Sequence, residues 1–181
     1  MARIFIALTP KPELNTIISA LKNDQKKLLY KKAKVNWSKR SQHHITLNFI
    51  GSMEPEQKEE MFNDLDQRPP FKNLSIEIDS LRYFPNENGQ VLVANISLTP
   101  RLQKLFNDVE AIVARIGLGM ALKTFRPHIT LARFKDKNRP FSQLIELDTP
   151  IKSTMDSLDV YESSFDSGKT LHSLIKSYNF E

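Results

Sequence analysis

The tetrapeptide His-Ile-Thr-Leu occurs at residues 44–47 and again at residues 128–131, 84 positions later in a chain of 181 residues. The chain has four histidines, and a chance match of the three residues that follow any two of them has a probability on the order of one in five hundred. An offset close to half the chain length indicates an internal repeat. We therefore expect two similar halves that fold in the same way.

Both copies lie in β-branched, strand-like runs, where successive side chains point to opposite faces. The histidine and threonine of each copy then share one face, and the isoleucine and leucine share the other. We expect a polar face that carries His44, Thr46, His128 and Thr130, and we assign Phe49 to the apolar face.

The hydrophobic periodicity along the chain predicts an α+β fold with mainly antiparallel pairing. Strands are expected at residues 3–8, 35–37, 44–50, 74–83, 91–98, 128–134, 155–161 and 171–178, and helices at 10–29, 55–65 and 100–116. Thr9 and Thr99 each precede a proline and are predicted as helix N-caps. We expect residues 1–181 to form one domain of two similar lobes, with antiparallel sheets and outer helices around a central cleft on a pseudo-two-fold axis.

Several classes of protein are excluded by what the sequence lacks. The chain has no cysteine, which removes disulfides, thiolate zinc sites and cysteine nucleophiles. It also has no Gly-x-Ser-x-Gly elbow, phosphate-binding P-loop or Gly-x-Gly-x-x-Gly turn. Since His-x-Thr offers one strong metal ligand, we expect neither metal nor cofactor. With no run of 18 apolar residues and no export signal, we expect a cytoplasmic monomer that binds no membrane.

Basic residues gather in two segments, and the net charge is +5. The first segment holds Lys22, Lys26, Lys27, Lys31, Lys32, Lys34, Lys39 and Arg40, and the second holds Lys123, Arg126, Arg133, Lys135, Lys137 and Arg139. Lysine and arginine clusters attract polyanions such as nucleic acid, but they also form ordinary solvated surfaces. Both interpretations stay open for the first segment, whereas the second flanks the repeated motif and favours a role in function.

Two imidazoles on opposite sides of one phosphorus suit phosphoryl chemistry, because one can act as a neutral base while the other acts as a charged acid. Threonine hydroxyls can bind the non-bridging oxygens, and Arg133 can neutralise charge that grows on the phosphate. Arg133 has the wrong parity to share a face with His128 in a regular strand. It can reach the site only through a bulge or from the end of the strand.

The segments Gln42-His43-His44-Ile45-Thr46-Leu47-Asn48-Phe49-Ile50-Gly51 and Phe125-Arg126-Pro127-His128-Ile129-Thr130-Leu131-Ala132-Arg133 resemble the two-histidine phosphoesterases. The similarity is greatest to the bacterial RNA 2′,3′-cyclic phosphodiesterases, historically called 2′-5′ RNA ligases. The resemblance implies that His44 is the general acid on the leaving 3′ oxygen and that His128 is the base for water. It also implies phosphate contacts from Thr46, Thr130 and Arg133.

The resemblance implies hydrolysis of 2′,3′-cyclic phosphate ends of RNA or oligonucleotides to 2′-phosphates, and it leaves reversible 2′-5′ ligation open. ADP-ribose 1″,2″-cyclic phosphate is an alternative substrate, and a nucleotide- or RNA-binding module without turnover is the alternative from another class. His43 and His172 lack a partner motif and are interpreted as structural or surface residues. Candidate aromatic platforms for base stacking are Tyr30, Trp37, Phe125 and Phe134, with Phe49 favoured as a core residue.

Overall fold

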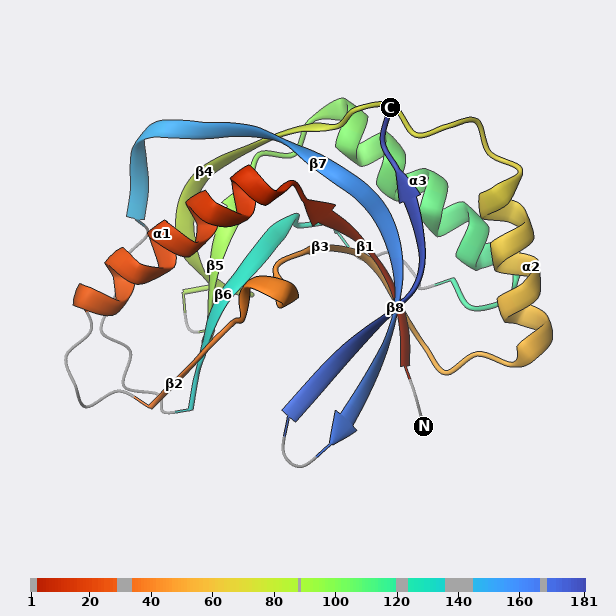
Figure 1. The fold of residues 1–181 in the computed structure, drawn as a ribbon, viewed down its shortest axis with the longest axis horizontal. Helices are drawn as coiled ribbons and strands as arrows, with labels where there is room; N and C mark the ends of the chain where they lie inside the picture. The colour runs from red at the N-terminus through yellow and green to blue at the C-terminus, as the bar shows by residue number, and fades with distance from the viewer. Residues whose placement is uncertain (1–2, 29–33, 88, 120–123, 136–144, 167–168) are drawn as a thin grey trace.

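The computed structural model describes residues 3–28, 34–87, 89–119, 124–135, 145–166 and 169–181. Its strands are β1 (Arg3–Pro10), β2 (Val35–Trp37), β3 (Ile45–Gly51), β4 (Ser75–Phe84), β5 (Val91–Ile96), β6 (His128–Phe134), β7 (Ile145–Asp166) and β8 (Lys169–Asn179). The helices are α1 (Pro12–Leu28), α2 (Pro55–Asp66) and α3 (Pro100–Arg115), with a short 3₁₀ turn at Arg40–Gln42. The α+β prediction is confirmed (Figure 1).

All pairings between these strands are antiparallel, and they run in the order β1-β3-β6-β5-β4-β7-β8, with β2 added beside β6. Two groups of strands can be distinguished, one of β8, β7, β1 and β3 and the other of β2, β6, β5, β4 and β7. Strand β7 belongs to both groups, because its first half pairs with β4 and its second half pairs with β1 and β8. It arches across the top of the molecule and joins the two halves (Figure 1).

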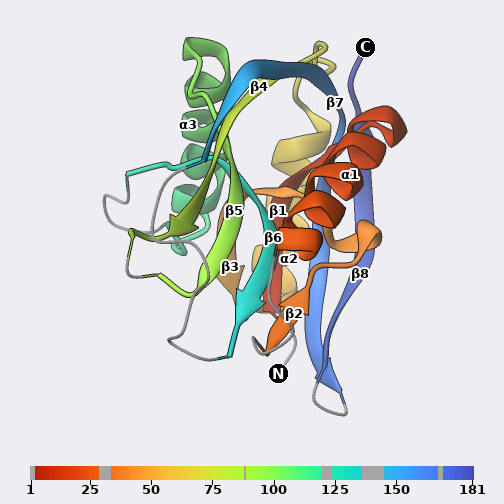
Figure 2. The same ribbon diagram turned by 90° about the vertical axis from the view of Figure 1, so that its left-hand side faces the viewer.

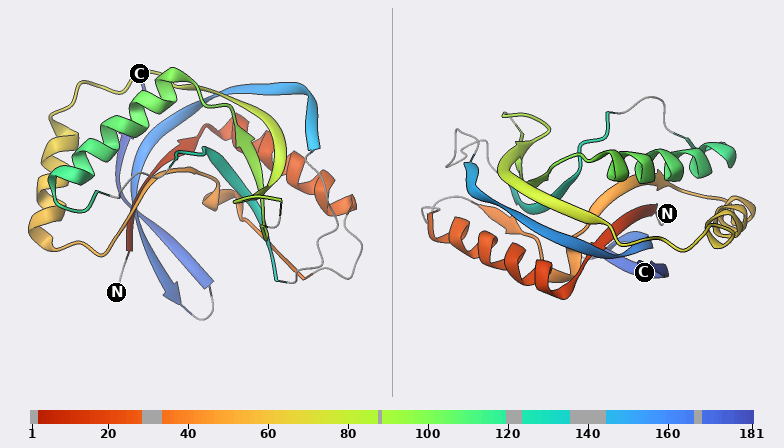
Figure 3. Two further views of the ribbon diagram at one scale, coloured as in Figure 1. Left: turned by 180° about the vertical axis from the view of Figure 1, so that it is seen from behind. Right: turned by 90° about the horizontal axis from the view of Figure 1, so that it is seen from above.

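The sheet lies between α1 on one side and α3 on the other (Figure 2), and α2 lies beside α3 (Figure 3). Helix α3 buries one face against the sheet through Leu102, Val109, Ile112 and Val113. It begins as predicted, because the Thr99 hydroxyl accepts a hydrogen bond from the Leu102 amide at 3.2 Å.

The prediction that Thr9 caps the first helix is wrong. Strand β1 continues through Pro10, and the Thr9 hydroxyl donates to the Asp159 carboxylate on β7 instead. The helix starts at Pro12. A cross-strand acceptor that is distant in sequence therefore replaces the local cap.

Strand β7 is much longer than the predicted segment 155–161, since it begins at Ile145. Pro150 lies within the unpredicted part, and proline is typical of strand breaks. The register against β4 jumps from Ile78–Ile151 to Ser80–Glu146, so the proline occupies an irregular stretch of a strand that nevertheless continues. Within the described residues, no helix is long and apolar enough to cross a membrane.

Candidate active site

The two copies of the motif meet at one point, where Ile45 of β3 pairs with Ile129 of β6. Both isoleucines are fully buried. The flanking histidines and threonines lie on the other, partly open face of the strands. Antiparallel register places His44 beside Thr130 and Thr46 beside His128. The repeat thus brings two imidazoles and two hydroxyls together around a pseudo-two-fold axis through this bridge. These four side chains are called the two-histidine site below.

Each copy of the motif contains a β-bulge at its leucine. In β3, Thr46 pairs with Ala7 and Asn48 with Ile6, so Leu47 is an extra residue. In β6, Thr130 pairs with Val93 and Ala132 with Leu92, so Leu131 is extra. Each leucine and the residue after it are both buried, as expected when a bulge reverses the alternation of faces.

The bulges bring the fifth residue after each histidine, Phe49 in one half and Arg133 in the other, back to the face of the two-histidine site. For Arg133 the bulge is one of the two routes that the sequence left open, the other being the end of the strand. Its guanidinium lies close enough to act electrostatically on His44 and His128. For Phe49 the assignment to the core is wrong. Its side chain is 48% exposed, and its ring stacks on Phe5 with centroids 6.2 Å apart.

Both histidines of the site are held in the same way. The Nδ1 atom of His44 lies 2.8 Å from the Gln42 carbonyl oxygen, and that of His128 lies 2.8 Å from the Arg126 carbonyl oxygen. Because a carbonyl oxygen can only accept, each Nδ1 carries the hydrogen. Each Nε2 is then the basic nitrogen of a neutral imidazole, and it becomes a proton donor once the ring is charged.

The pKa of His44 is lowered to about 4, chiefly by burial and also by the nearby His172, His128 and Arg133, against the opposing effect of the Gln42 carbonyl. Burial also lowers the pKa of His128, with a smaller contribution from Arg133. Both imidazoles are therefore neutral at pH 7 in the absence of a ligand. A bound anion would favour the charged form of His44 and raise its pKa.

We expect the rise in the pKa of His44 on anion binding to be visible by NMR. In long-range ¹H–¹⁵N spectra, His44 and His128 should appear as neutral Nδ1–H tautomers at pH 7. Saturating sulfate, a stable dianion, should raise the titration midpoint of His44 from about 4 to above about 5, because it offsets the charge of Arg133.

His43 is the internal control for this titration. Burial holds its pKa at about 4, and its Nδ1 bonds to Asn15 Oδ1 at 2.7 Å, away from the site. Its midpoint should not respond to sulfate. A His44 midpoint that also fails to respond would show that no anion binds between the histidines.

Aromatic side chains from three strands surround His44. The ring centroid of Phe5 lies 5.2 Å from that of His44 and 5.2 Å from that of Tyr161, and the His172 ring stands edge-on to His44 at 5.5 Å. His172 therefore lies in the site, although the sequence offered no motif to place it there. Strands β1, β7 and β8 bring these residues together from distant parts of the chain, which explains why no local pattern indicates them.

The surroundings of His128 are different. Phe84 of β4 stacks on its ring, with centroids 4.2 Å apart, and a pocket of about 410 Å³ opens beside it. The pocket is lined in part by Asp79, Arg82, Asn95 and Phe125. Three aromatic rings thus surround the first histidine, while one ring and a pocket of mixed polar and apolar lining adjoin the second.

Several other candidates from the sequence make structural contacts, and some lie outside the described residues. Lys22 of the first basic segment is buried and donates to the Ser38 carbonyl at 2.7 Å, and Arg40 binds the Pro12 carbonyl at 2.9 Å. Phe134 is a core residue, Phe125 stacks on Phe106, and Lys26 lies over the ring of Trp37.

Six of the candidates fall outside the described residues, namely Tyr30, Lys31, Lys32, Lys123, Lys137 and Arg139. In the described part of the chain, no three His, Asp or Glu side chains are grouped to hold a metal ion.

Comparison with known proteins gives the class of this site. The LigT-like phosphoesterase family matches twice, over residues 10–94 and over residues 93–168, so each match contains one copy of the repeated motif. A fold with two related halves and one histidine motif in each defines a two-histidine phosphoesterase. The chain belongs to the LigT-like phosphoesterase family.

Individual relatives agree with this assignment. An RNA 2′,3′-cyclic phosphodiesterase of Thermotoga maritima is 26% identical over 183 aligned positions that cover 99% of this chain and 96% of that protein. The fold is shared with the protein TT0787 of Thermus thermophilus (TM-score 0.82, 18% identity, 98% and 97% of the chains). It is also shared with E. coli LigT in complex with 3′-AMP (TM-score 0.73, 21% identity, 98% and 97% of the chains).

Proposed function

We propose that this protein hydrolyses the 2′,3′-cyclic phosphate ends of RNA or oligonucleotides to 2′-phosphates without a metal ion. The observation that carries the proposal is the pairing of two imidazoles across the Ile45–Ile129 bridge, each with its Nδ1 fixed by a backbone carbonyl. The T. maritima relative supports the RNA cyclic phosphate as substrate, and the 3′-AMP complex of E. coli LigT supports nucleotide binding in this fold.

The proposed reaction begins with the cyclic phosphate between the histidines. Thr46, Thr130 and Arg133 bind its non-bridging oxygens and stabilise the negative charge of the transition state. The anionic substrate also raises the pKa of His44, which enters the reaction as imidazolium.

His128 Nε2 then removes a proton from the attacking water, and a new P–O bond forms opposite the bond to the 3′ oxygen. That P–O bond breaks, and His44 Nε2 donates its proton to the departing oxygen. The product is a 2′-phosphate with a free 3′-hydroxyl, and His128 now carries the proton that His44 has lost. Two imidazoles of opposite protonation state are sufficient for these steps.

One incubation tests the proposal. A short RNA with a 2′,3′-cyclic phosphate end, incubated with the protein in excess EDTA, should be converted to the 2′-phosphate, as identified by ³¹P NMR. A 3′-phosphate product, or activity lost in EDTA and restored by Zn²⁺ or Mn²⁺, would contradict the proposal. A higher kcat/KM for ADP-ribose 1″,2″-cyclic phosphate would instead assign that alternative substrate.

A further inference from the structure

Exposed apolar side chains lead away from the two-histidine site along residues 161–165 of β7 and 170–174 of β8, which are called the outer arm below. Phe165 is 76% exposed and Leu174 is 56% exposed. The arm projects from the body of the molecule, beyond the first residues of β1 (Figure 1). Large apolar side chains that stay exposed together, rather than singly, mark an interaction surface.

The strand register decides which side chains of the arm face the two-histidine site. Residues directly opposite in an antiparallel pair share a face of the sheet. Tyr161 pairs with Phe5, and Phe5 pairs with Phe49. The rings of Phe5 and Tyr161 lie beside His44, so this is the face of the site. Phe165 lies four residues, or about 13 Å, further along β7 and on the same face.

A polar row crosses this face halfway to Phe165. Arg3 of β1 pairs with Ser163 of β7, which pairs with His172 of β8. Arg3 is exposed, and the ring of His172 stands edge-on to His44. Aromatic rings with a cation between them suit a single strand of nucleic acid, because rings stack on bases and cations attract the backbone phosphates.

The proposed reaction places the RNA strand on this side of the site. The attacking oxygen and the leaving 3′ oxygen lie roughly in line on opposite sides of the phosphorus. Water is activated at His128, so the ribose that carries the 3′ oxygen lies at His44. Every nucleotide that precedes the cyclic end is joined to that ribose through its 5′ oxygen. The strand therefore leaves the site on the side of Phe5 and Tyr161.

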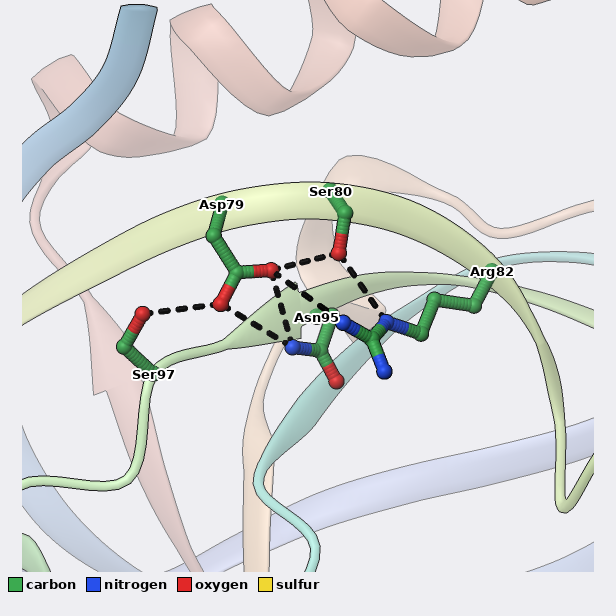
Figure 4. Close-up of polar contacts among 5 residues, drawn as sticks. All are labelled: Asp79, Ser80, Arg82, Asn95 and Ser97. Carbon is green, nitrogen blue, oxygen red and sulfur yellow. Dashed lines mark hydrogen bonds and ion pairs between the residues drawn. The ribbon is translucent and has the colours of Figure 1, made fainter. Parts of the chain in front are cut away.

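The pocket beside His128 is organised differently. The Asp79 carboxylate there accepts hydrogen bonds from three side chains and pairs with one cation, and these partners are Ser80, Asn95, Ser97 and Arg82 (Figure 4). Burial raises the pKa of Asp79, but the hydrogen bonds outweigh burial and hold the pKa below its ordinary value. The carboxylate is thus charged at pH 7, and it repels the phosphates of a strand.

We propose that the outer arm binds the single strand of RNA that precedes the cyclic end, and that Phe165 stacks on one of its bases. This inference rests on the proposed function and adds to it a preference for chain length. A distance of about 13 Å corresponds to about four nucleotides at roughly 3.4 Å each. A cyclic mononucleotide reaches Tyr161 only, whereas a pentanucleotide also reaches Phe165. Arg3, between these two rings, attracts a backbone phosphate.

The experiment compares two substrates with the same cyclic end, a 2′,3′-cyclic mononucleotide and a pentanucleotide RNA. In Phe165→Ala, KM for the pentanucleotide should rise at least about fivefold, the scale of one lost contact between a base and a ring. Its kcat and its KM for the mononucleotide should not change, since Phe165 is remote from the histidines. Phe165→Tyr keeps the ring and should behave like the wild type.

The contribution of Arg3 is measured through salt. In Arg3→Gln, KM for the pentanucleotide should rise, and the slope of log KM against log salt concentration should fall by about one, as expected for one lost phosphate contact. The slope for the mononucleotide should stay as in the wild type. An unchanged slope for the pentanucleotide would overturn the assignment of Arg3 to the strand.

Leu171→Ala is the matched control. Leu171 is 47% exposed on the same arm, but it pairs with Ser164 and therefore lies on the opposite face. Its KM for the pentanucleotide should equal that of the wild type. An equal rise in Leu171→Ala, or a rise in Phe165→Ala that is as large for the mononucleotide, would overturn the inference. A rise in Asn95→Ala with none in Phe165→Ala would place the strand in the pocket beside His128 and would also overturn it.

A binding measurement keeps the inference separate from the proposed function. Fluorescence anisotropy with a pentanucleotide that ends in a 2′-phosphate reports affinity without turnover, and Phe165→Ala should bind it at least about fivefold more weakly. Equal affinity in the two proteins would overturn the inference and leave the proposed function intact. Failure of the wild type to hydrolyse either cyclic substrate would overturn the proposed function, while the anisotropy would still decide whether the arm binds RNA.

Discussion

Replacement of either His44 or His128 with alanine is expected to lower kcat for hydrolysis of a 2′,3′-cyclic phosphate by about 10²–10⁴-fold, or about 3–5 kcal/mol of transition-state stabilisation. Each imidazole presents Nε2 as its reacting nitrogen, so neither variant retains a group that can move the proton at that position. Initial rates with a cyclic mononucleotide, together with product binding by calorimetry, measure the effect. Binding of a 2′-phosphate should survive, because Thr46, Thr130 and Arg133 remain.

His43→Gln separates loss of chemistry from loss of folding. His43 is adjacent to His44 but is buried, where it bonds to Asn15. Its replacement should lower Tm while kcat per folded molecule stays within about threefold of the wild type, since it moves no proton in the reaction. Activity in His44→Ala or His128→Ala within tenfold of the wild type would contradict the proposed acid–base pair.

The proposed catalytic residues could be identified from the sequence because they lie in an exact repeat. The alternation of faces in a strand was enough to separate the histidines and threonines from Ile45 and Ile129, which the structure buries. The same rule failed five residues beyond each histidine, because a bulge resets the alternation at Leu47 and Leu131. For Arg133 the expected phosphate contact required either a bulge or a place at the strand end, so an irregularity could be anticipated. For Phe49 an apolar side chain gave no such reason, and it was assigned to the wrong face.

The residues around the two-histidine site could not be predicted, since they depend on long-range pairing. His172, Tyr161 and Phe5 meet only because β7 pairs with both β1 and β8. The pocket beside His128 likewise depends on the register of β4 against β5, which places Asp79 near Asn95. Single-strand patterns show which face a residue occupies, but they do not show which strand lies beside it. The differences between the surroundings of the two histidines therefore became visible only in the structure.

The two histidines are expected to differ in their response to the leaving group, because an acid contributes most when the departing oxygen needs a proton. The comparison uses a 2′,3′-cyclic mononucleotide, which expels an alkoxide, and a 3′-deoxynucleoside 2′-(p-nitrophenyl phosphate), which expels a stable phenolate and cannot cyclise. His44→Ala should lose about 10²–10⁴-fold on the first substrate and less than about tenfold on the second. His128→Ala should lose about 10²–10⁴-fold on both, since water must be deprotonated in either case.

The pattern of these four losses decides the roles. Each is measured as kcat at saturating substrate and at one pH, and it is compared with the wild type on the same substrate, so that differences in binding and in intrinsic reactivity cancel. Identical losses in both variants on both substrates would show that the division into acid and base is wrong, even with both histidines essential. Losses confined to the cyclic substrate in His128→Ala would exchange the two roles. In that case water would enter beside His44 and its aromatic neighbours, and the pocket beside His128 would receive the departing nucleoside.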